Sequence, residues 1–252
     1  MVRACAIGDF VLNLPALRAI AGQNPSARFT LVGYPQTLAL ATPFIDVEAI
    51  HSIESPPWSS LFIRPLPDLD FDCAWVWMKD ALLADRLRES GVGEVFQVAP
   101  FPDGMHAADH LLATARLPAP DLPDLWLPGS KRVIVHPGSG SLEKCWPWYE
   151  ELSNRLQDVT MLIGPCESEV RTRHPRLEGL TLTAVAEEIR RSRVFIGNDS
   201  GITHLAAYWG CPTIALFGPT DPGIWGPVGR RVTILRKTPL REISVDDIID
   251  IL

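Results

Sequence analysis

Short apolar runs alternate with helix-length segments along most of this chain, and a single proline-rich stretch interrupts the alternation. Alternating strand and helix signals are typical of βαβ units, which build parallel sheets covered by helices. Residues 117–130 contain four prolines, which exclude a regular helix or strand and predict an extended linker. Since 252 residues are enough for two cores, we expect an α/β protein with domains at residues 1–125 and 126–252.

The expected elements follow from apolar runs and helical spacing. Strands are predicted at residues 2–7, 28–33, 73–77, 94–98, 132–135, 160–163, 193–196, 213–217 and 232–235. Helices are predicted near residues 10–21, 80–89, 105–117, 147–156, 184–191 and 202–209, the last with Gly210 as C-cap. Pro15 predicts that the first regular helix begins near Asn13 or is kinked. Ligands of parallel sheets bind beyond the carboxyl ends of the strands, so polar clusters there are candidate sites.

Composition excludes several classes of protein. Thirty acidic against 23 basic residues give a net charge of −7, which argues against a mainly electrostatic nucleic-acid binder. No apolar run approaches the roughly 20 residues that span a bilayer, and the N-terminus lacks a signal peptide, so we expect a cytoplasmic protein. Five cysteines without a Cys-x-x-Cys pair predict reduced thiols. The basic stretches at residues 171–176 and 190–193 fit solvated helix faces better than an anion-binding surface.

The run from Val194 to Ala207 reads as a buried strand, a polar turn and the start of a helix. Its Gly-Asn-Asp-Ser-Gly turn brings small and polar residues to a helix N-terminus, where free N–H groups and the helix dipole favour an anion such as phosphate. The alternative is an ordinary helix cap by Asp199 or Ser200, with His204 one turn later. The segment by itself leaves both interpretations open.

Polar clusters follow other expected strands as well. Asp9 follows the first strand, either as a capping carboxylate or as a general base. Residues 136–147 form a Gly/Ser loop with one lysine, suited to a diphosphate or simply a flexible surface loop. Residues 162–169 carry two carboxylates that fit ribose hydroxyls or a solvated helix start, and turn chemistry explains most of residues 217–222.

A rival site lies at Asp68, Asp70 and Asp72, which form overlapping Asp-x-Asp patterns. Such carboxylates hold Mg²⁺ or Mn²⁺ in metal-dependent sugar transferases. The pattern arises often by chance, however, and here it precedes a strand in a proline-rich region. Neither half supplies Gly-x-Gly-x-x-Gly after its first strand, and no Walker A loop occurs, which disfavours an oxidoreductase or a P-loop protein. We therefore expect neither a metal nor a cofactor.

Four ordered motifs together resemble glycosyltransferase family 9, the ADP-heptose:lipopolysaccharide heptosyltransferases. They are Gly8-Asp9 with 14–17 (Leu-Pro-Ala-Leu), 136–140 (His-Pro-Gly-Ser-Gly) with 144–147 (Lys-Cys-Trp-Pro), 197–201 (Gly-Asn-Asp-Ser-Gly) with 204–206 (His-Leu-Ala), and 216–222 (Leu-Phe-Gly-Pro-Thr-Asp-Pro). The resemblance implies a GT-B fold, in which two Rossmann-like domains with parallel sheets face each other across a cleft. The N-terminal domain, shortened around residues 35–67, would bind the acceptor and the C-terminal domain the nucleotide-sugar.

The same resemblance implies roles for individual residues. Asp9 matches the catalytic base of a reaction that inverts the anomeric carbon and needs no metal. The implied donor-binding residues are Ser139, Lys144, Glu167, Asp199, Ser200, Gly201, Thr203 and His204. Among them Ser139, Lys144 and the helix start would hold the phosphates and Glu167 the ribose, while Asp199 would contact the donor sugar or cap the helix.

The implied substrates are ADP-heptose and an acceptor in the lipopolysaccharide inner core, used in the cytoplasm with or without peripheral contact to the inner membrane. Two alternatives stay open. One is a transferase of the same fold that uses another nucleotide-sugar or a protein acceptor. The other is a non-catalytic protein that only binds a nucleotide-sugar.

Overall fold

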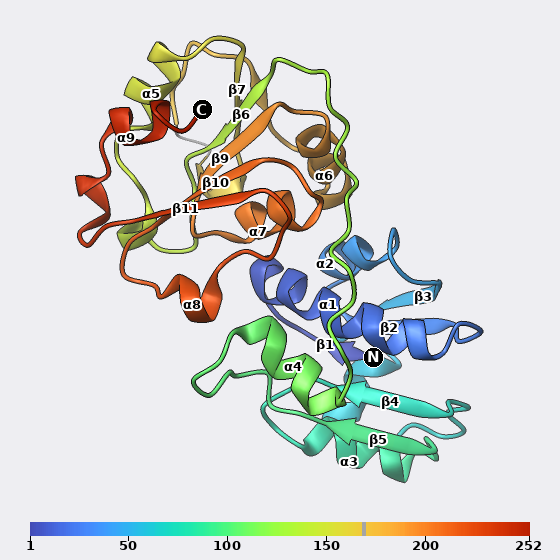
Figure 1. The fold of residues 1–252 in the computed structure, drawn as a ribbon. Coiled ribbons are helices and arrows are strands. Elements are labelled where there is room, and N and C mark those ends of the chain that lie inside the picture. The colour runs from blue at the N-terminus through green and yellow to red at the C-terminus, as the bar shows by residue number, and fades with distance from the viewer. Residues whose placement is uncertain (168–169) are drawn as a thin grey trace. The chain divides into compact units, whose positions relative to one another are not determined.

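The computed structural model describes residues 1–167 and 170–252. The chain forms two compact units, Met1–Pro120 and Asp121–Leu252, and each contains one parallel sheet flanked by helices (Figure 1). The division falls slightly before the predicted boundary after residue 125, because residues 121–127 pack on the second unit. In the described residues no helix is both long and apolar enough to cross a membrane.

The first unit has a five-stranded sheet in the order β3-β2-β1-β4-β5, with all neighbouring strands parallel. Its strands are β1 (Val2–Arg3), β2 (Phe29–Gly33), β3 (Val47–Ser52), β4 (Cys73–Val76) and β5 (Glu94–Gln97). Its α-helices are α1 (Ile7–Gln23), α2 (Pro35–Leu38), α3 (Leu82–Glu89) and α4 (Ala107–Ala115), with 3₁₀ turns η1 (Ala39–Ala41) and η2 (Trp58–Phe62).

The start of this unit differs from the prediction. Strand β1 ends at Arg3, and α1 begins at Ile7 and continues through Pro15. Pro15 costs the helix a backbone hydrogen bond. The side chains of Phe10, Leu14 and Leu17 are completely buried or nearly so, and we attribute the continuous helix to that apolar burial. The early helix start places Asp9 in the first turn of α1.

Two hydrophobic layers hold the first sheet. On one face, residues of η2 and α3 such as Trp58, Leu61 and Leu83 pack against Val2 and Val76 of the sheet. Because side chains alternate along a strand, Arg3 points to the opposite face, where α1 packs against α4. The carboxyl end of β1 therefore lies next to the first turns of α1, and the Arg3 side chain points toward that helix.

The second unit has a six-stranded sheet in the order β11-β10-β9-β6-β7-β8, again parallel throughout. Its strands are β6 (Val133–His136), β7 (Val159–Leu162), β8 (Arg176–Leu177), β9 (Val194–Asn198), β10 (Thr213–Phe217) and β11 (Val232–Arg236). Its α-helices are α5 (Tyr149–Arg155), α6 (Leu182–Arg190), α7 (Gly201–Tyr208), α8 (Pro222–Trp225) and α9 (Val245–Ile249), with 3₁₀ turns η3 (Leu142–Lys144), η4 (Pro165–Glu167) and η5 (Leu240–Glu242).

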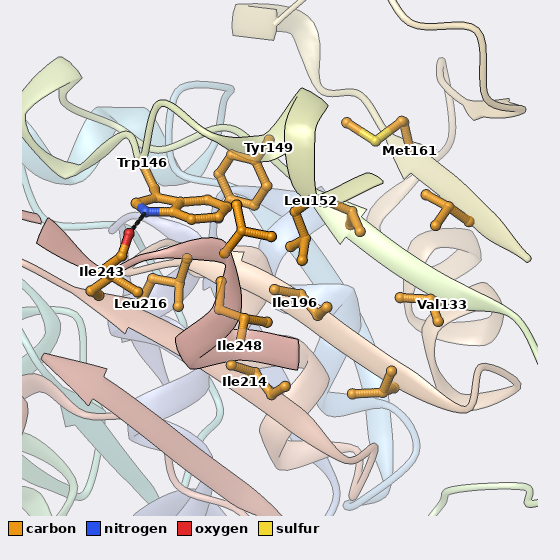
Figure 2. Close-up of a cluster of buried hydrophobic side chains, with 14 of the residues drawn as sticks. Val133, Trp146, Tyr149, Leu152, Met161, Ile196, Ile214, Leu216, Ile243 and Ile248 are labelled. Atoms are coloured by element: carbon orange, nitrogen blue, oxygen red, sulfur yellow. Dashed lines mark hydrogen bonds between the residues drawn. The ribbon is translucent and has the colours of Figure 1, made fainter. Parts of the chain in front are cut away.

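One face of the second sheet carries a large apolar cluster that includes α5 and α9 (Figure 2). Trp146 is its most specific member: the indole ring meets Tyr149 edge-on at 5.0 Å, and its Nε1 donates to the Ile243 carbonyl at 2.8 Å. The other face is covered by α6 and α7. Trp146 thereby fixes the end of the loop that follows β6.

The predicted linker is only partly a linker, because residues 121–127, here called the strap, pack on the second unit. The Leu125 N–H donates to the Trp209 carbonyl at 3.1 Å, and the Leu127 N–H donates to the Arg190 carbonyl at 2.8 Å. The Trp126 indole donates to the Ser192 carbonyl at 2.8 Å. Pro123 favours an extended backbone in the strap, and these contacts make the strap part of the second unit.

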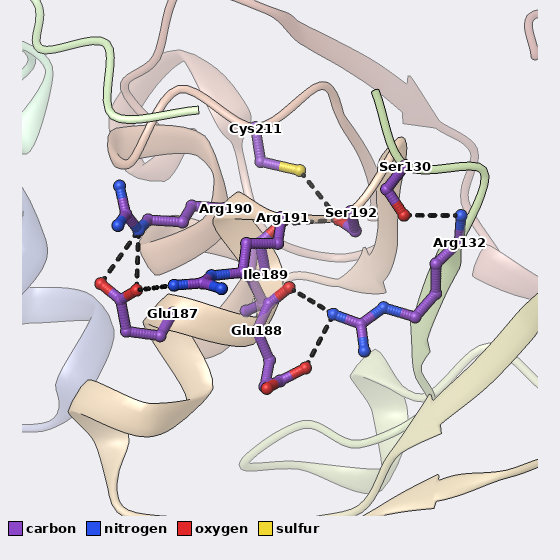
Figure 3. Close-up of polar contacts among 9 residues, drawn as sticks. All are labelled: Ser130, Arg132, Glu187, Glu188, Ile189, Arg190, Arg191, Ser192 and Cys211. Carbon is purple, nitrogen blue, oxygen red and sulfur yellow. Dashed lines mark hydrogen bonds and ion pairs between the residues drawn. The ribbon is translucent and has the colours of Figure 1, made fainter. Parts of the chain in front are cut away.

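Charged side chains reinforce the same region. Arg132 pairs with Glu188 at 2.7 Å, while Arg190 and Arg191 both face Glu187 (Figure 3). Two of the three arginines in the basic stretch at residues 190–193, Arg190 and Arg191, therefore pair with a carboxylate of their own helix, as expected for a solvated helix face. The described cysteine side chains, those of Cys5, Cys73, Cys145 and Cys211, are free thiols as predicted.

Candidate functional site

The strand orders place one topological switch point in each sheet. In the second sheet the chain leaves β6 toward β7 and later returns on the other side as β9, so the loops after β6 and β9 diverge. In the first sheet the same occurs between β1 and β4. Ligands of open α/β sheets bind in the crevice at such points. Each unit therefore has its candidate site where the sequence places its polar motif.

Asn198 fixes the loop after β6. Its amide group is fully buried, donates to the Pro137 carbonyl at 2.7 Å and accepts from the Trp146 N–H at 3.0 Å. Both ends of the Gly/Ser loop are thus tied to the end of β9. Asn198 belongs to the Gly-Asn-Asp-Ser-Gly motif, but no role was predicted for it, although a buried asparagine at a strand end is a signal for such a tie.

Ser200 is the N-cap of α7, so the helix-cap interpretation holds for this residue. Its backbone is extended, and its hydroxyl accepts from the Thr203 N–H at 3.4 Å. The Thr203 hydroxyl in turn donates to the Asn198 carbonyl and is completely buried. Both hydroxyls are used in hydrogen bonds that stabilise the start of α7. Gly201 begins the helix without a side chain that would cover its N-terminus.

Asp199 does not cap α7 but faces Lys144, whose ammonium donates to Asp199 Oδ2 at 2.7 Å. The Asp199 side chain is only 7% exposed, and His204 Nε2 lies 3.8 Å from its other oxygen. Burial alone would raise the pKa of the Asp199 carboxyl, but the His204, Lys144 and Thr220 side chains outweigh burial and lower it to about 2. Asp199 is therefore ionised throughout the physiological range.

Ser139 and His204 complete this cluster. The Ser139 hydroxyl donates to the Asp199 backbone carbonyl at 2.8 Å, which brings the loop after β6 against the turn after β9. His204 is almost fully buried, and its Nδ1 has no hydrogen-bond partner among the described residues. Thr220, in the turn after β10, hydrogen-bonds to the Asp199 carboxylate and belongs to the same cluster. Turn chemistry was the predicted role of Thr220, and only the adjacency of β9 and β10 in the sheet reveals its position.

Glu167 lies at a neighbouring strand end and contacts the same loop. Its Oε2 accepts from the Gly164 N–H at 2.9 Å, and its carboxylate lies so close to Gly138 that an added Cβ would be 2.0 Å from Oε1. His136 is buried nearby and donates from Nδ1 to the Leu162 carbonyl at 2.9 Å, and burial lowers the pKa of its imidazole. Glu169, the second predicted carboxylate, lies outside the described residues.

The candidate site of the first unit contains Asp9. This carboxylate is half-buried in the first turn of α1, just past the end of β1. Within the described part of the chain its side chain makes no hydrogen bond or ion pair. A half-buried, unpartnered carboxylate is available to accept a proton.

The rival Asp-x-Asp segment is not gathered into an ion site. Asp68 has a positive φ of 54°, and the segment lies before β4, away from the carboxyl ends of the strands. Among the described residues no group of three or more His, Cys, Asp or Glu side chains is placed to hold a metal. Asp221, in the fourth cluster, caps α8 by accepting from the Gly223 N–H at 3.1 Å.

Comparisons with known proteins agree on one family. Residues 114–246 match the family described as glycosyltransferase family 9 (heptosyltransferase). Lipopolysaccharide heptosyltransferase 1 of Pseudomonas aeruginosa is 26% identical over 287 residues, covering 91% of this chain and 81% of that protein. The Escherichia coli protein of the same name is 33% identical over 233 residues, covering 86% of this chain and 68% of that protein.

Solved structures show the fold. An Escherichia coli heptosyltransferase with ADP superposes with a TM-score of 0.78 at 18% identity, covering 99% of this chain and 97% of that one. The Escherichia coli ADP-heptose lipopolysaccharide heptosyltransferase II gives a TM-score of 0.80 at 17% identity, covering 99% and 95%. The family match and the shared architecture lead to one conclusion: this chain belongs to glycosyltransferase family 9, the heptosyltransferases, and is a glycosyltransferase with the GT-B fold.

Proposed function

We propose that this protein transfers heptose from ADP-heptose to a sugar of the lipopolysaccharide inner core, with inversion at the anomeric carbon and without a metal. The observation that carries the proposal is the convergence of Ser139, Lys144 and the N-terminus of α7 at the switch point between β6 and β9. A cation, hydroxyls and free backbone N–H groups in one place form a site for a diphosphate. The names of the relatives support heptose as the sugar.

The donor would be held by residues from several strand ends. Lys144 and the start of α7 bind the diphosphate, and Glu167 accepts hydrogen bonds from the ribose hydroxyls. Asp199 is ionised and repels phosphate, so its place is beside the hydroxyls of the donor sugar. His204 lines the same pocket, with its unpartnered Nδ1 available to a ligand.

In the reaction the acceptor hydroxyl oxygen attacks the anomeric carbon while the Asp9 carboxylate takes its proton. The bond between the anomeric carbon and the phosphate oxygen breaks, and ADP leaves with the electron pair. Lys144 and the α7 N–H groups stabilise the negative charge that develops on ADP. Since the acceptor is a lipid-linked glycan, a peripheral place at the cytoplasmic face of the inner membrane follows from the same proposal.

Calorimetric titration of the purified protein tests the donor. We expect ADP to bind in preference to UDP and GDP, ADP-heptose to bind more tightly than ADP, and EDTA to leave each affinity unchanged. Preference for another nucleotide would contradict the donor assignment. Loss of binding with EDTA, restored by Mg²⁺, would contradict metal independence.

A transfer assay tests the chemistry. Asp9→Asn removes the base and keeps the shape, so we expect the turnover number to fall by about 100-fold or more while ADP-heptose affinity is retained. Unchanged turnover would contradict the role of Asp9. Tight ADP-heptose binding by the wild-type protein without transfer to any core acceptor would favour the non-catalytic alternative.

A further inference from the structure

The carboxyl end of β1 carries a buried cation that no carboxylate of the described residues pairs with. Arg3 is the last residue of β1 and is 7% exposed. In the described residues its guanidinium forms no ion pair. Removing a guanidinium from water is costly unless its N–H groups find acceptors. The partners of Arg3 therefore indicate what the residue is for.

Those partners link three elements. Arg3 Nη1 donates to the Trp77 carbonyl, just past the end of β4, at 2.9 Å. The groups around Asn13 assign the orientation of its amide, because only with the oxygen toward Arg3 and the nitrogen toward Asp9 do donors meet acceptors. In this orientation Arg3 Nε donates to the Asn13 side-chain oxygen at 2.9 Å, and the Asn13 amide nitrogen donates to the backbone carbonyl of Asp9 at 2.8 Å. A single hydrogen-bonded chain thus runs from β4 through β1 to the first turn of α1. We call Arg3 and Asn13 the clamp.

The clamp forms a hydrogen bond to the backbone carbonyl of Asp9 and not to its carboxylate. Asn13 lies one helical turn beyond Asp9 and is 4% exposed, so its amide is shielded from water. It supplies the Asp9 carbonyl with a second donor besides the helical N–H. The carboxylate itself is left without a hydrogen bond in the described part of the chain, as a group that accepts a proton requires.

The backbone of Arg3 is fixed as well. Arg3 pairs with Gly33 across β1 and β2, and a Cβ on Gly33 would lie 1.9 Å from the Arg3 carbonyl oxygen. Only glycine permits this approach. The clamp is therefore anchored in the centre of the sheet, and β1, with only two residues, gains a rigid end.

We propose that Arg3 and Asn13 are positioning residues for Asp9, which they hold in the orientation that proton transfer needs. The inference rests on the proposed role of Asp9 as the base. Catalytic groups misplaced by about 1 Å lose up to about 100-fold in rate. A free first turn, opened by Ala6 without a side-chain cap, would not hold Asp9 that well.

Kinetics of single and double variants test the clamp. Asn13→Leu keeps the branching at Cγ and removes both hydrogen bonds, and we expect it to lower kcat by about tenfold or more with the donor KM within about twofold. Arg3→Lys retains one donor, so its kcat is expected to lie between those of wild type and Asn13→Leu. Leu17→Ala, which opens a cavity elsewhere in α1, is the destabilised control and should retain the wild-type kcat.

The double variant separates positioning from structure. If the clamp acts through Asp9, adding Asn13→Leu to Asp9→Asn lowers kcat no further. Should Asn13→Leu not fold, Asn13→Asp keeps the acceptor for Arg3 and removes the donor to the Asp9 carbonyl, and the same result is expected.

Three outcomes would overturn the inference, and they are distinguishable. If Asn13→Leu retains the kcat of Leu17→Ala, or lowers kcat equally in the Asp9→Asn background, the clamp does not position Asp9, while the proposed base stands. If Asp9→Asn itself retains wild-type turnover, the proposed base is wrong and the clamp has nothing to position.

Discussion

The Lys144 ammonium lies 2.7 Å from Asp199 Oδ2, and this ion pair joins the loop after β6 to the turn after β9. Asp199 is almost fully buried, whereas a third of the Lys144 side chain, 33%, is exposed. The ammonium that we propose for the donor diphosphate is thus paired with a buried carboxylate. On that proposal, donor binding shares or replaces this pair.

This competition predicts opposite effects for the two partners. Lys144→Ala removes a charge-assisted hydrogen bond to phosphate and should weaken ADP binding by about 10- to 100-fold. Asp199→Asn frees Lys144, so ADP should bind as tightly as to wild type or more tightly, while the added affinity given by the heptose is lost. Calorimetry with ADP and ADP-heptose measures both, and Lys131→Ala, an exposed lysine before β6, is the matched control. If Asp199→Asn weakens ADP binding as much as Lys144→Ala does, Asp199 and the diphosphate do not compete for Lys144.

The lowered pKa of Asp199 also predicts that the stability of the folded protein depends on pH. Its pKa is about 2 in the folded protein against 3.8 for the ordinary group, so the folded state favours the carboxylate. The resulting stabilisation is present above about pH 4 and is lost as the pH falls toward about pH 2, and it amounts to about 2 kcal/mol. Urea unfolding at several acidic pH values should show the wild-type protein losing this advantage over Asp199→Asn.

The matched control for this titration is Asp246→Asn. Asp246 pairs with Arg155 at 2.6 Å, but its side chain is 71% exposed. Exposed pairs contribute little, so the stability difference between this variant and wild type should stay constant over the same pH range. A constant difference for Asp199→Asn as well would show that the His204, Lys144 and Thr220 side chains do not depress the pKa of Asp199 in solution.

A substitution at Gly138 tests the proposed role of Glu167 in donor binding. A Cβ at Gly138 would meet the Glu167 carboxylate, the far end of a flexible side chain, whereas a Cβ at Gly140 would meet nothing within 4 Å. Gly138→Ala should therefore displace Glu167 at little cost in stability and weaken ADP binding by about tenfold, the value of one hydrogen bond to a charged group. Gly140→Ala, in the same loop, should retain wild-type affinity. Equal affinities for both variants would exclude Glu167 from the donor site.

The sequence predicted those elements whose signal is local. Strands β6, β9 and β10 are nearly continuous apolar runs, as buried parallel strands require, and they were found close to their observed bounds. Strand β3 was missed because its residues Val47–Ser52 are half-exposed and include charged and polar side chains, and β8 has only two residues. The early start of α1 has no helix-capping signal in the sequence, since Ala6 offers no capping side chain.

The candidate site was predictable as a set of loops but not as a set of contacts. Glycine, serine and lysine after expected strands located Ser139, Lys144 and the start of α7. The pairing of Lys144 with Asp199 depends on β6 and β9 being neighbours, and such a contact between residues far apart in sequence has no local signal. The same holds for the hydrogen bonds of Arg3 to Asn13 and Trp77.

The strap gives a prediction for the stability of the second unit. Trp126 is half-buried, donates to the Ser192 carbonyl, and has the Arg231 guanidinium 4.8 Å from its ring centroid. Arg231 is held in turn by both carboxylate oxygens of Asp124, at 2.8 and 2.7 Å. Trp126→Ala removes apolar burial, a hydrogen bond and a cation–π contact, and should lower the free energy of unfolding by about 2 kcal/mol.

Scanning calorimetry of the full chain locates this effect. The transition that ADP raises belongs to the second unit, since a ligand stabilises the unit it binds, and Trp126→Ala should lower that transition and leave the other in place. Leu127→Ala is the control, because its side chain is already 45% exposed and exposed substitutions change stability by about 0.5 kcal/mol or less. If Trp126→Ala behaves like Leu127→Ala, the strap is a linker that rests on the second unit without stabilising it.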